Sequence, residues 1–231
     1  MSNQFQNMLR EGLRNISNKP LEAIEIINKF DYLQKAFKYI IINNKANNAP
    51  YHNLNHLLTV TKFAYQGMLY ENLDDKESLK LMLLTTIFHD VNHSAGKKSD
   101  DVNVSNSKKA LKAFVESEDI KIDLDEANKL LDATQYPYVI EAKDLTELQK
   151  IIRDADLTQV FEYNWIQQNI IGLSTELNID FFDFLKGQRK FLDNAEFNSK
   201  WGKALKKEKW NTTMKQFDML ENIAKVKIKI I

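Results

Sequence analysis

Apolar residues recur at steps of three and four along most of the chain, which is the period of an amphipathic helix. This pattern predicts helices over about residues 54–69, 104–115, 145–155, 165–177, 181–192 and 210–220. The stretch Leu79–Phe88 is apolar on almost every side, so we expect a central helix that is buried all round. Another helix is expected to end at Ala133–Thr134, before Pro137.

Polar segments and a few prolines separate these stretches. The polar run 92–101 predicts a loop, and the prolines at 20, 50 and 137 lie between periodic segments. Near the end of the chain Val226, Ile228 and Ile230 alternate with lysines, which leaves open a short strand or a frayed tail. Six glycines and three prolines are too few for a turn-rich β architecture. We therefore expect one all-α domain, a helical bundle spanning residues 1–231.

Composition narrows the class of protein further. A chain of 231 residues can bury a sizeable core, and its 32 basic and 32 acidic residues give no net charge. That balance argues against a dedicated binder of nucleic acid or of an anionic membrane. The absence of cysteine excludes disulfides, thiolate metal sites and a cysteine nucleophile. Without a membrane-length apolar run or a signal-peptide pattern, we predict a cytoplasmic protein whose oligomeric state is open.

The histidines are unusual in their placement. There are only four, and they form two pairs with a spacing of four residues, His52 with His56 and His89 with His93. In a helix this spacing places both rings of a pair on the same side.

Two carboxylates accompany the histidines. Asp90 follows His89 directly at the end of the most apolar stretch, an expensive place for charge unless a partner satisfies it. Asp156 comes four residues, about one helical turn, after Ile152 of the apolar stripe 145–155 and can point from a helix end toward the core. Imidazole nitrogens and carboxylate oxygens together suit a divalent ion such as Zn, Mn or Fe. A site of two His and two Asp also leaves positions open for water, as metal-assisted hydrolysis requires.

Three segments carry a resemblance to a known family: Tyr51-His-Asn-Leu-Asn-His56, Phe88-His-Asp-Val-Asn-His93 and Arg153-Asp-Ala-Asp-Leu157. In this order they resemble the HD-domain superfamily of metal-dependent phosphohydrolases. The first segment is similar to the YHNxxH motif of class I cyclic-nucleotide phosphodiesterases, and bacterial predicted HD phosphohydrolases fit at least as well. The match covers about residues 50–192. It implies a bundle of the HD-domain type, with the N- and C-terminal helices packed on this core.

The resemblance assigns roles to particular residues. It implies one or two divalent ions (Zn, Mn, Fe or Mg) held by His56, His89, Asp90 and Asp156. It makes His52 the general acid, places Asp90 against both ions, and gives His93 a place beside the bridging carboxylate, the leaving group or the second ion. Gln188-Arg-Lys-Phe191 matches a Gln-x-x-Phe purine clamp, so Gln188 and Arg189 are candidate substrate contacts. Asp154 is expected to face solvent or to support a ligand.

These features together predict a hydrolase that acts on a small-molecule nucleotide. The favoured substrate is a nucleotide phosphodiester, cyclic ones included, because a dedicated acid matters most when the leaving group is a poor one. Two alternatives within enzymes are a nucleotide monophosphatase and an alarmone hydrolase. An alternative of another class is a signalling or defence module that binds a nucleotide without turnover.

Overall fold

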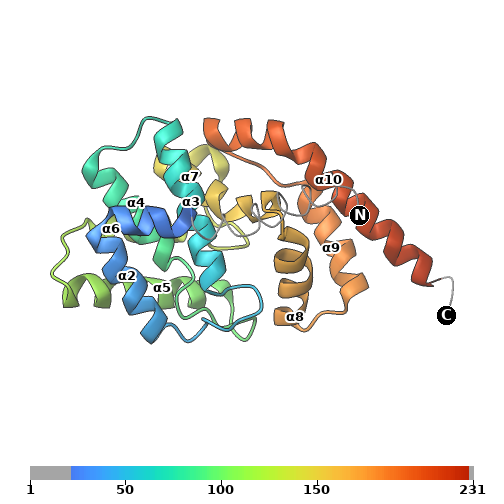
Figure 1. The fold of residues 1–231 in the computed structure, drawn as a ribbon, viewed down its shortest axis with the longest axis horizontal. Coiled ribbons are helices and arrows are strands. Elements are labelled where there is room, and N and C mark those ends of the chain that lie inside the picture. The colour runs from blue at the N-terminus through green and yellow to red at the C-terminus, as the bar shows by residue number, and fades with distance from the viewer. Residues whose placement is uncertain (1–21, 229–231) are drawn as a thin grey trace, which may run out of the picture.

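The computed structural model describes residues 22–228, and every regular element within them is helical. A helical segment at residues 22–29 precedes the labelled helices, which Figure 1 shows as α2 (Asp31–Asn43), α3 (Leu54–Tyr70), α4 (Lys76–Phe88), α5 (Asp100–Ser117), α6 (Leu124–Asp132), α7 (Glu147–Leu157), α8 (Leu173–Leu177), α9 (Phe181–Asp193) and α10 (Lys200–Ile228). Two short 3₁₀ helices, η1 (Ala142–Asp144) and η2 (Thr158–Phe161), and a π-helix, η3 (Ile166–Gly172), complete the set. The predicted all-α class is confirmed. No helix among residues 22–228 combines the length and the apolar character that crossing a membrane requires.

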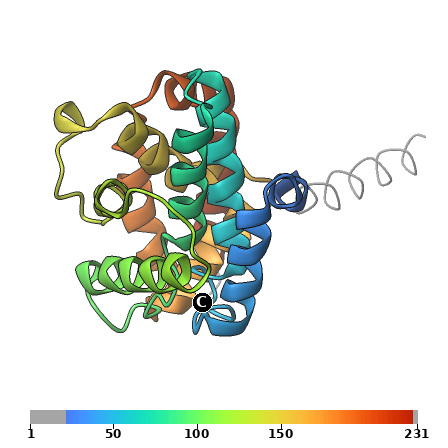
Figure 2. The same ribbon diagram turned by 90° about the vertical axis from the view of Figure 1, so that its left-hand side faces the viewer.

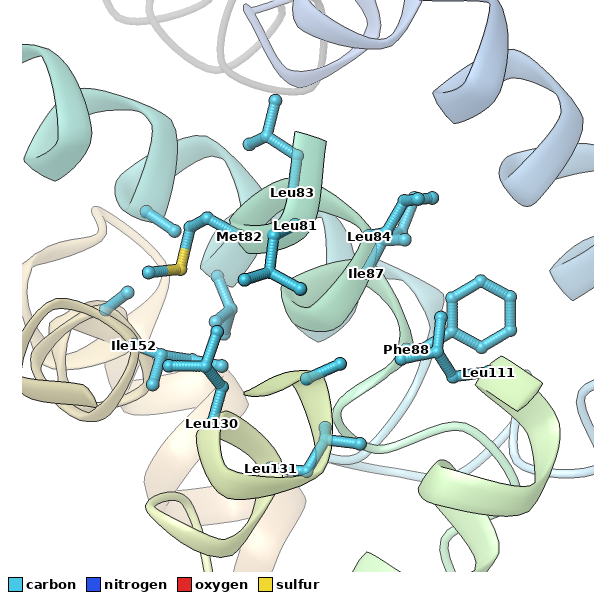
Figure 3. Packing of buried hydrophobic residues seen from close by; sticks show 14 of the residues in the cluster. Leu81, Met82, Leu83, Leu84, Ile87, Phe88, Leu111, Leu130, Leu131 and Ile152 are labelled. Carbon is cyan, nitrogen blue, oxygen red and sulfur yellow. The ribbon is translucent and has the colours of Figure 1, made fainter. Parts of the chain in front are cut away.

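Helix α4 lies at the centre of the first part of the molecule. It contacts α2, α3, α5, α6 and α7, and Figure 2 shows α3 and α4 side by side. Because neighbours surround α4, side chains on all its sides are buried, including those of Leu83, Leu84 and Ile87. Figure 3 shows the side chains of α4 leaving the helix on different sides: Met82 and Leu81 point toward Ile152 and Leu130 of the adjacent helices, and Leu83 points the opposite way. Each such burial is worth about 1.5–3 kcal/mol, so the expected central helix carries much of the core.

Two hydrophobic clusters make up the interior. The larger is built from the segments up to Ala155 together with Trp201, and the smaller from residues between Val160 and Ala224. In Figure 1 α2–α7 lie to the left and α8 and α9 to the right, with α10 running along the top. Helix α10 joins the two clusters, because Trp201 packs in the first and Phe217 in the second.

Some expected boundaries differ from the observed ones. The loop predicted at 92–101 ends two residues earlier, since α5 begins at Asp100. Asp100 and Asp101 lie in the first turn of α5, where negative charge interacts favourably with the positive end of the helix dipole. This interaction accounts for the earlier start of the helix. The stretch 165–177 is helical but changes from the π-helix η3 to α8, which ends at Asn178 in a left-handed conformation (φ 52°).

The end of the chain also differs from one expectation. Helix α10 runs through Val226 to Ile228, so a strand there is wrong, while Ile230 lies outside the described residues. The buried positions Phe217 and Ala224 follow the helical period and pack in the second cluster. This packing outweighs the short alternation of apolar and basic residues that suggested a strand.

Candidate metal centre and the adjoining cavity

Helix ends position the predicted metal ligands. His56 lies in the first turn of α3, where Asn53 caps the helix and its Oδ1 accepts a hydrogen bond from the His56 backbone N–H at 3.2 Å. His89 is the C-terminal cap of α4, and Asp90 follows it. Asp156 lies in the last turn of α7. Three elements that are far apart in sequence therefore bring these four residues into one group.

The donor atoms of this group are spaced as they would be around a cation. His56 Nε2 lies 3.1 Å from Asp90 Oδ2 and 3.2 Å from Asp156 Oδ1. His89 Nε2 lies 3.1 Å from the same Asp90 oxygen and 3.6 Å from the same Asp156 oxygen. Metal–ligand bonds of about 2.0–2.2 Å at angles near 90–110° place ligand atoms roughly 3 to 3.5 Å apart. The residues present fit a divalent ion in both chemistry and spacing.

Hydrogen bonds to the far side of each ring fix its tautomer. His56 Nδ1 lies 3.2 Å from Gln159 Oε1, and His89 Nδ1 lies 2.7 Å from the backbone carbonyl of Thr86. Both partners are acceptors, so each Nδ1 carries the proton. In the neutral form of these rings, the two Nε2 atoms, 3.1 Å apart, direct their lone pairs toward the centre. This is the arrangement by which proteins orient histidine ligands.

The charges of the group reinforce one another. Burial alone would lower the pKa of His56, but hydrogen bonds to Asp156 and Asp90 raise it to about 9. Burial would likewise raise the pKa of Asp156, yet His56 and His89 hold it well below its usual range. Asp90 is held low in the same way, chiefly by His89. The carboxylates thus stay ionised in a buried place and attract positive charge, from a proton or from a metal ion.

A second group lies beside the first and consists of His52, His93 and Glu176. The Glu176 side chain has no exposed surface. One of its oxygens forms a short hydrogen bond with His52 Nδ1, and the other accepts the backbone N–H groups of Tyr51 and His52 at 2.9 and 3.0 Å. Burial would raise the pKa of Glu176, but the hydrogen bond with His52 lowers it to about 2. On the other side of the ring, His52 Nε2 lies 3.9 Å from Asp90 Oδ2.

His93 packs directly against His52. The two rings stack with their centroids 3.5 Å apart, and His93 Nδ1 lies 3.6 Å from Glu176 Oε1. Asn103 Nδ2 donates to His93 Nε2 at 2.8 Å, while Asn103 Oδ1 accepts the backbone N–H of Ser94 at 2.9 Å. The backbone N–H of Ala95 donates to the other ring nitrogen, His93 Nδ1, at 3.1 Å, so hydrogen-bond donors reach both nitrogens of this ring.

A close backbone approach places Glu176 next to the first histidine. A Cβ at Gly172 would come within 2.7 Å of the carbonyl oxygen of Pro50, so only glycine lets η3 lie against this turn. Helix α8 begins directly after Gly172 and carries Glu176 one turn later. The approach therefore sets the distance between the Glu176 carboxylate and the His52 ring.

Side chains from neighbouring elements fix the turn after Asp90. Asn92 takes a left-handed conformation (φ 62°), which asparagine tolerates well. Its backbone N–H donates to Asn44 Oδ1 at 2.8 Å, and its own Oδ1 accepts the N–H of Lys45 at 3.0 Å. Ser107 Oγ donates to the carbonyl of His89 at 2.6 Å. The turn is thus held from two sides, and so are the directions of His89 and Asp90.

A cavity of about 510 Å³, here called the inner cavity, opens beside both groups and is lined by His52, His93 and Asp156 among others. The rest of its wall is largely aromatic and aliphatic, and it includes Tyr51, Tyr136, Tyr138, Leu173, Phe184 and Phe191. A mostly apolar hollow with a few polar groups at one end is typical of a small-molecule site. Burial, then the charges of Asp156 and Asp90, raises the pKa of Tyr51 well above its usual value, so its phenol is neutral.

The two predicted substrate residues have different positions. Gln188 is buried in the wall of the inner cavity and forms no side-chain hydrogen bond with the described residues. Arg189 points the other way, toward α10, where it pairs with Asp218 and with Glu221 (2.7 Å). Its guanidinium also lies over the ring of Phe217, 4.6 Å from the centroid. The structure thus places Gln188, but not Arg189, in the wall of the inner cavity.

Asp154 does not face solvent, which corrects one of the two expectations for it. It is fully buried and accepts hydrogen bonds from the backbone N–H groups of Asn198 and Ser199 and from the Ser199 hydroxyl. Burial raises the pKa of this carboxyl, and the hydrogen bonds oppose that effect. Asp154 therefore fastens the start of α10 to α7 and leaves Asp156 as the carboxylate of this segment that enters the centre.

Sequence reasoning missed two residues of the site, Glu176 and Gln159. Glu176 is 124 positions from His52, in a short helix whose acidic residue looks like surface charge. Gln159 supports His56 from a 3₁₀ turn that has no sequence motif. Only the three-dimensional contacts identify either residue.

The chain matches no known protein family model, and searches of curated proteins and of solved structures also return no match.

Proposed function

We propose that the protein is a metal-dependent phosphohydrolase that cleaves a nucleotide phosphoester, most favourably a phosphodiester. The observation that carries this proposal is the convergence of His56, His89, Asp90 and Asp156, with oriented Nε2 atoms, at the edge of a largely apolar cavity. A divalent ion bound by this set supplies the Lewis acidity that activates water near neutral pH and polarises a phosphoryl oxygen.

His52 is the group that protonates the leaving oxygen. Its Nδ1 is held by Glu176, which leaves Nε2 as the atom that faces Asp90 and the inner cavity. As the bond between phosphorus and the leaving oxygen breaks, the Nε2 proton passes to that oxygen. The attacking water forms the new bond to phosphorus and gives up one proton to solvent, and solvent returns a proton to Nε2 for the next cycle. The buried Glu176 carboxylate behind the ring holds Nδ1 and thereby orients Nε2 for this transfer.

Asp90 and His93 complete the machinery. Asp90 Oδ2 lies 3.1 Å from His56 Nε2 and 3.9 Å from His52 Nε2, so Asp90 is the member of the group of four that is placed to touch a second ion. His93 is held by the Ala95 N–H and by Asn103 and stacks on His52, which keeps the His52 ring in place. We assign His93 this positioning role in the proposed reaction.

The inner cavity sets the substrate. Its volume of about 510 Å³ falls in the usual range for a small ligand, and its apolar walls suit a ring system. Gln188 offers a free amide to such a ring. Since Arg189 is occupied by Asp218 and Glu221, the phosphate is held at the metal centre without it.

A panel assay tests the proposal. Chelated protein reloaded with Mn, Mg, Zn or Fe is offered cyclic and linear dinucleotides, cyclic mononucleotides, nucleoside monophosphates and alarmones, and released product is measured. We expect metal-dependent hydrolysis of a phosphodiester. Turnover of monophosphates or alarmones alone would contradict the phosphodiester assignment and identify those compounds as the substrates. Binding without turnover under every metal would identify a nucleotide-binding module instead of an enzyme.

A further inference from the structure

A second cavity of about 690 Å³ adjoins the inner one and is here called the outer cavity. Five residues line both: Tyr136, Tyr138, Leu157, Gly187 and Phe191. Each cavity alone is large enough for a drug-sized ligand, so the pair exceeds what one nucleoside needs.

Gly187 interrupts the shared wall. It lies in the middle of α9, where glycine is unfavourable, and a Cβ built there would meet nothing within 4 Å. No close packing therefore requires a glycine at this position. The missing side chain leaves open space between the two cavities.

The aromatic part of the wall is rigid and exposed. Tyr136 and Tyr138 are 54% and 39% exposed and meet edge to face, with ring centroids 5.5 Å apart. Arg153 lies under the ring of Tyr138 at 4.0 Å and donates to the carbonyls of Ala133 and Ile140, which flank this loop. From the other side, Asp100 accepts the Tyr136 backbone N–H at 2.6 Å. Large rings held in place yet open to a cavity are stacking surfaces for another ring.

The charge of the outer cavity indicates what can occupy it. Its charged lining residues are Glu141, Glu196, Arg153 and Lys190, two acidic and two basic. A further phosphate would find no excess of positive charge there, whereas an uncharged ring would find the tyrosines. We propose that the two cavities together take an extended nucleotide, with a second nucleoside stacked in the outer cavity. This inference rests on the proposed function for the placement of the phosphate.

Binding of the thymidine mononucleotide pT and the dinucleotide pTpT tests the inference. Titration calorimetry with the Mn-loaded protein, using analogues of both ligands in which non-hydrolysable phosphonates replace the phosphates, measures both dissociation constants without hydrolysis. We expect the wild type to bind pTpT at least tenfold more tightly than pT, roughly the effect of one stacked base. Gly187→Leu, which fills the gap, should reduce that advantage to less than twofold without lowering the melting temperature. Asp193→Leu, at an exposed position of α9 that lines neither cavity, should retain the full advantage.

Equal affinities for pT and pTpT in the wild type, or an advantage that survives Gly187→Leu, would overturn the inference. Loss of both ligands in Gly187→Leu would also contradict it, because the position would then belong to the inner site alone. The p-nitrophenyl esters of the same two ligands are assayed in parallel with metal. Absence of turnover with the dinucleotide advantage intact would refute the proposed function and leave the extended site standing.

Discussion

At the scale of single residues, His52 is the side chain whose role can be separated most cleanly from that of the metal. We expect His52→Asn to keep the fold and the bound metal but to slow hydrolysis of unactivated phosphodiesters by about 10²- to 10⁴-fold, the usual value of a positioned acid. A p-nitrophenyl ester should lose far less, because its leaving group departs without a proton. Initial rates on both substrates from one preparation measure the difference. Equal losses on the two would show that His52 positions substrate or metal.

Glu176 provides a test that depends on pH. Its pKa in the folded protein is about 2, below the ordinary value of 4.5, so its stabilising effect is complete above pH 4.5 and is lost as pH falls toward 2. That difference corresponds to about 3 kcal/mol. We expect the wild type to lose more unfolding free energy over this window than Glu176→Gln does. Denaturant titrations at several pH values measure both proteins, and parallel curves would contradict the buried ion pair.

The sequence predicted the four candidate metal ligands as one group because His56, His89, Asp90 and Asp156 lie in short segments with recognisable spacing. It could not predict Glu176, since contacts across 124 positions leave no local pattern. Arg189 is an error of the opposite kind, a predicted site residue that the structure places elsewhere. A cation in a plausible place was expected to contact substrate, but acidic residues on α10 pair with it.

At the scale of elements, the contact between η3 and the turn before α3 controls the distance between Glu176 and His52. Gly172→Ala would place a methyl group 2.7 Å from the carbonyl oxygen of Pro50. We expect a loss of about 1–3 kcal/mol in unfolding free energy, together with reduced activity, because relief of this clash moves Glu176 away from His52.

The matched control is Gly187→Ala in α9. There the added Cβ meets nothing within 4 Å, so helix propensity should leave stability unchanged or raise it by up to about 1 kcal/mol. Thermal melts of both variants measure the contrast. Similar stabilities for the two would mean that the close approach at Gly172 is not tight in the protein.

Helices were predictable where the apolar period was sustained, as in α3, α7 and α9. Their bounds were less so, because local capping decides them, as at Asp100 in α5. The π-helix η3 was not predictable, since its residues carry the same apolar pattern as an α-helix. At the end of α10, a short alternation of apolar and basic residues suggested a strand. The helix forms instead because it packs in the second cluster, and only the fold reveals that packing.

At the scale of the whole molecule, the proposed ion joins three elements of the larger cluster and should stabilise the fold. A ligand that binds only the native state at about 1,000 times its dissociation constant contributes about 4 kcal/mol. For a chain of this size we expect a chelator to lower the melting temperature by roughly 10 °C. Readdition of Mn or Zn should restore it. An unchanged melting temperature after verified metal removal would favour a purely structural role for the histidines.

The most direct test of the central claim is metal content and hydrolysis measured together in Asp90→Ala. Asp90 Oδ2 lies 3.1 Å from the Nε2 atoms of both His56 and His89, so its loss removes a shared partner of the centre. We predict that bound metal and phosphodiesterase activity fall together, to below a tenth of wild type, while Asp101→Ala, an exposed position in α5, retains both. Activity above a tenth of wild type in Asp90→Ala, or full metal content without its carboxylate, would contradict the account.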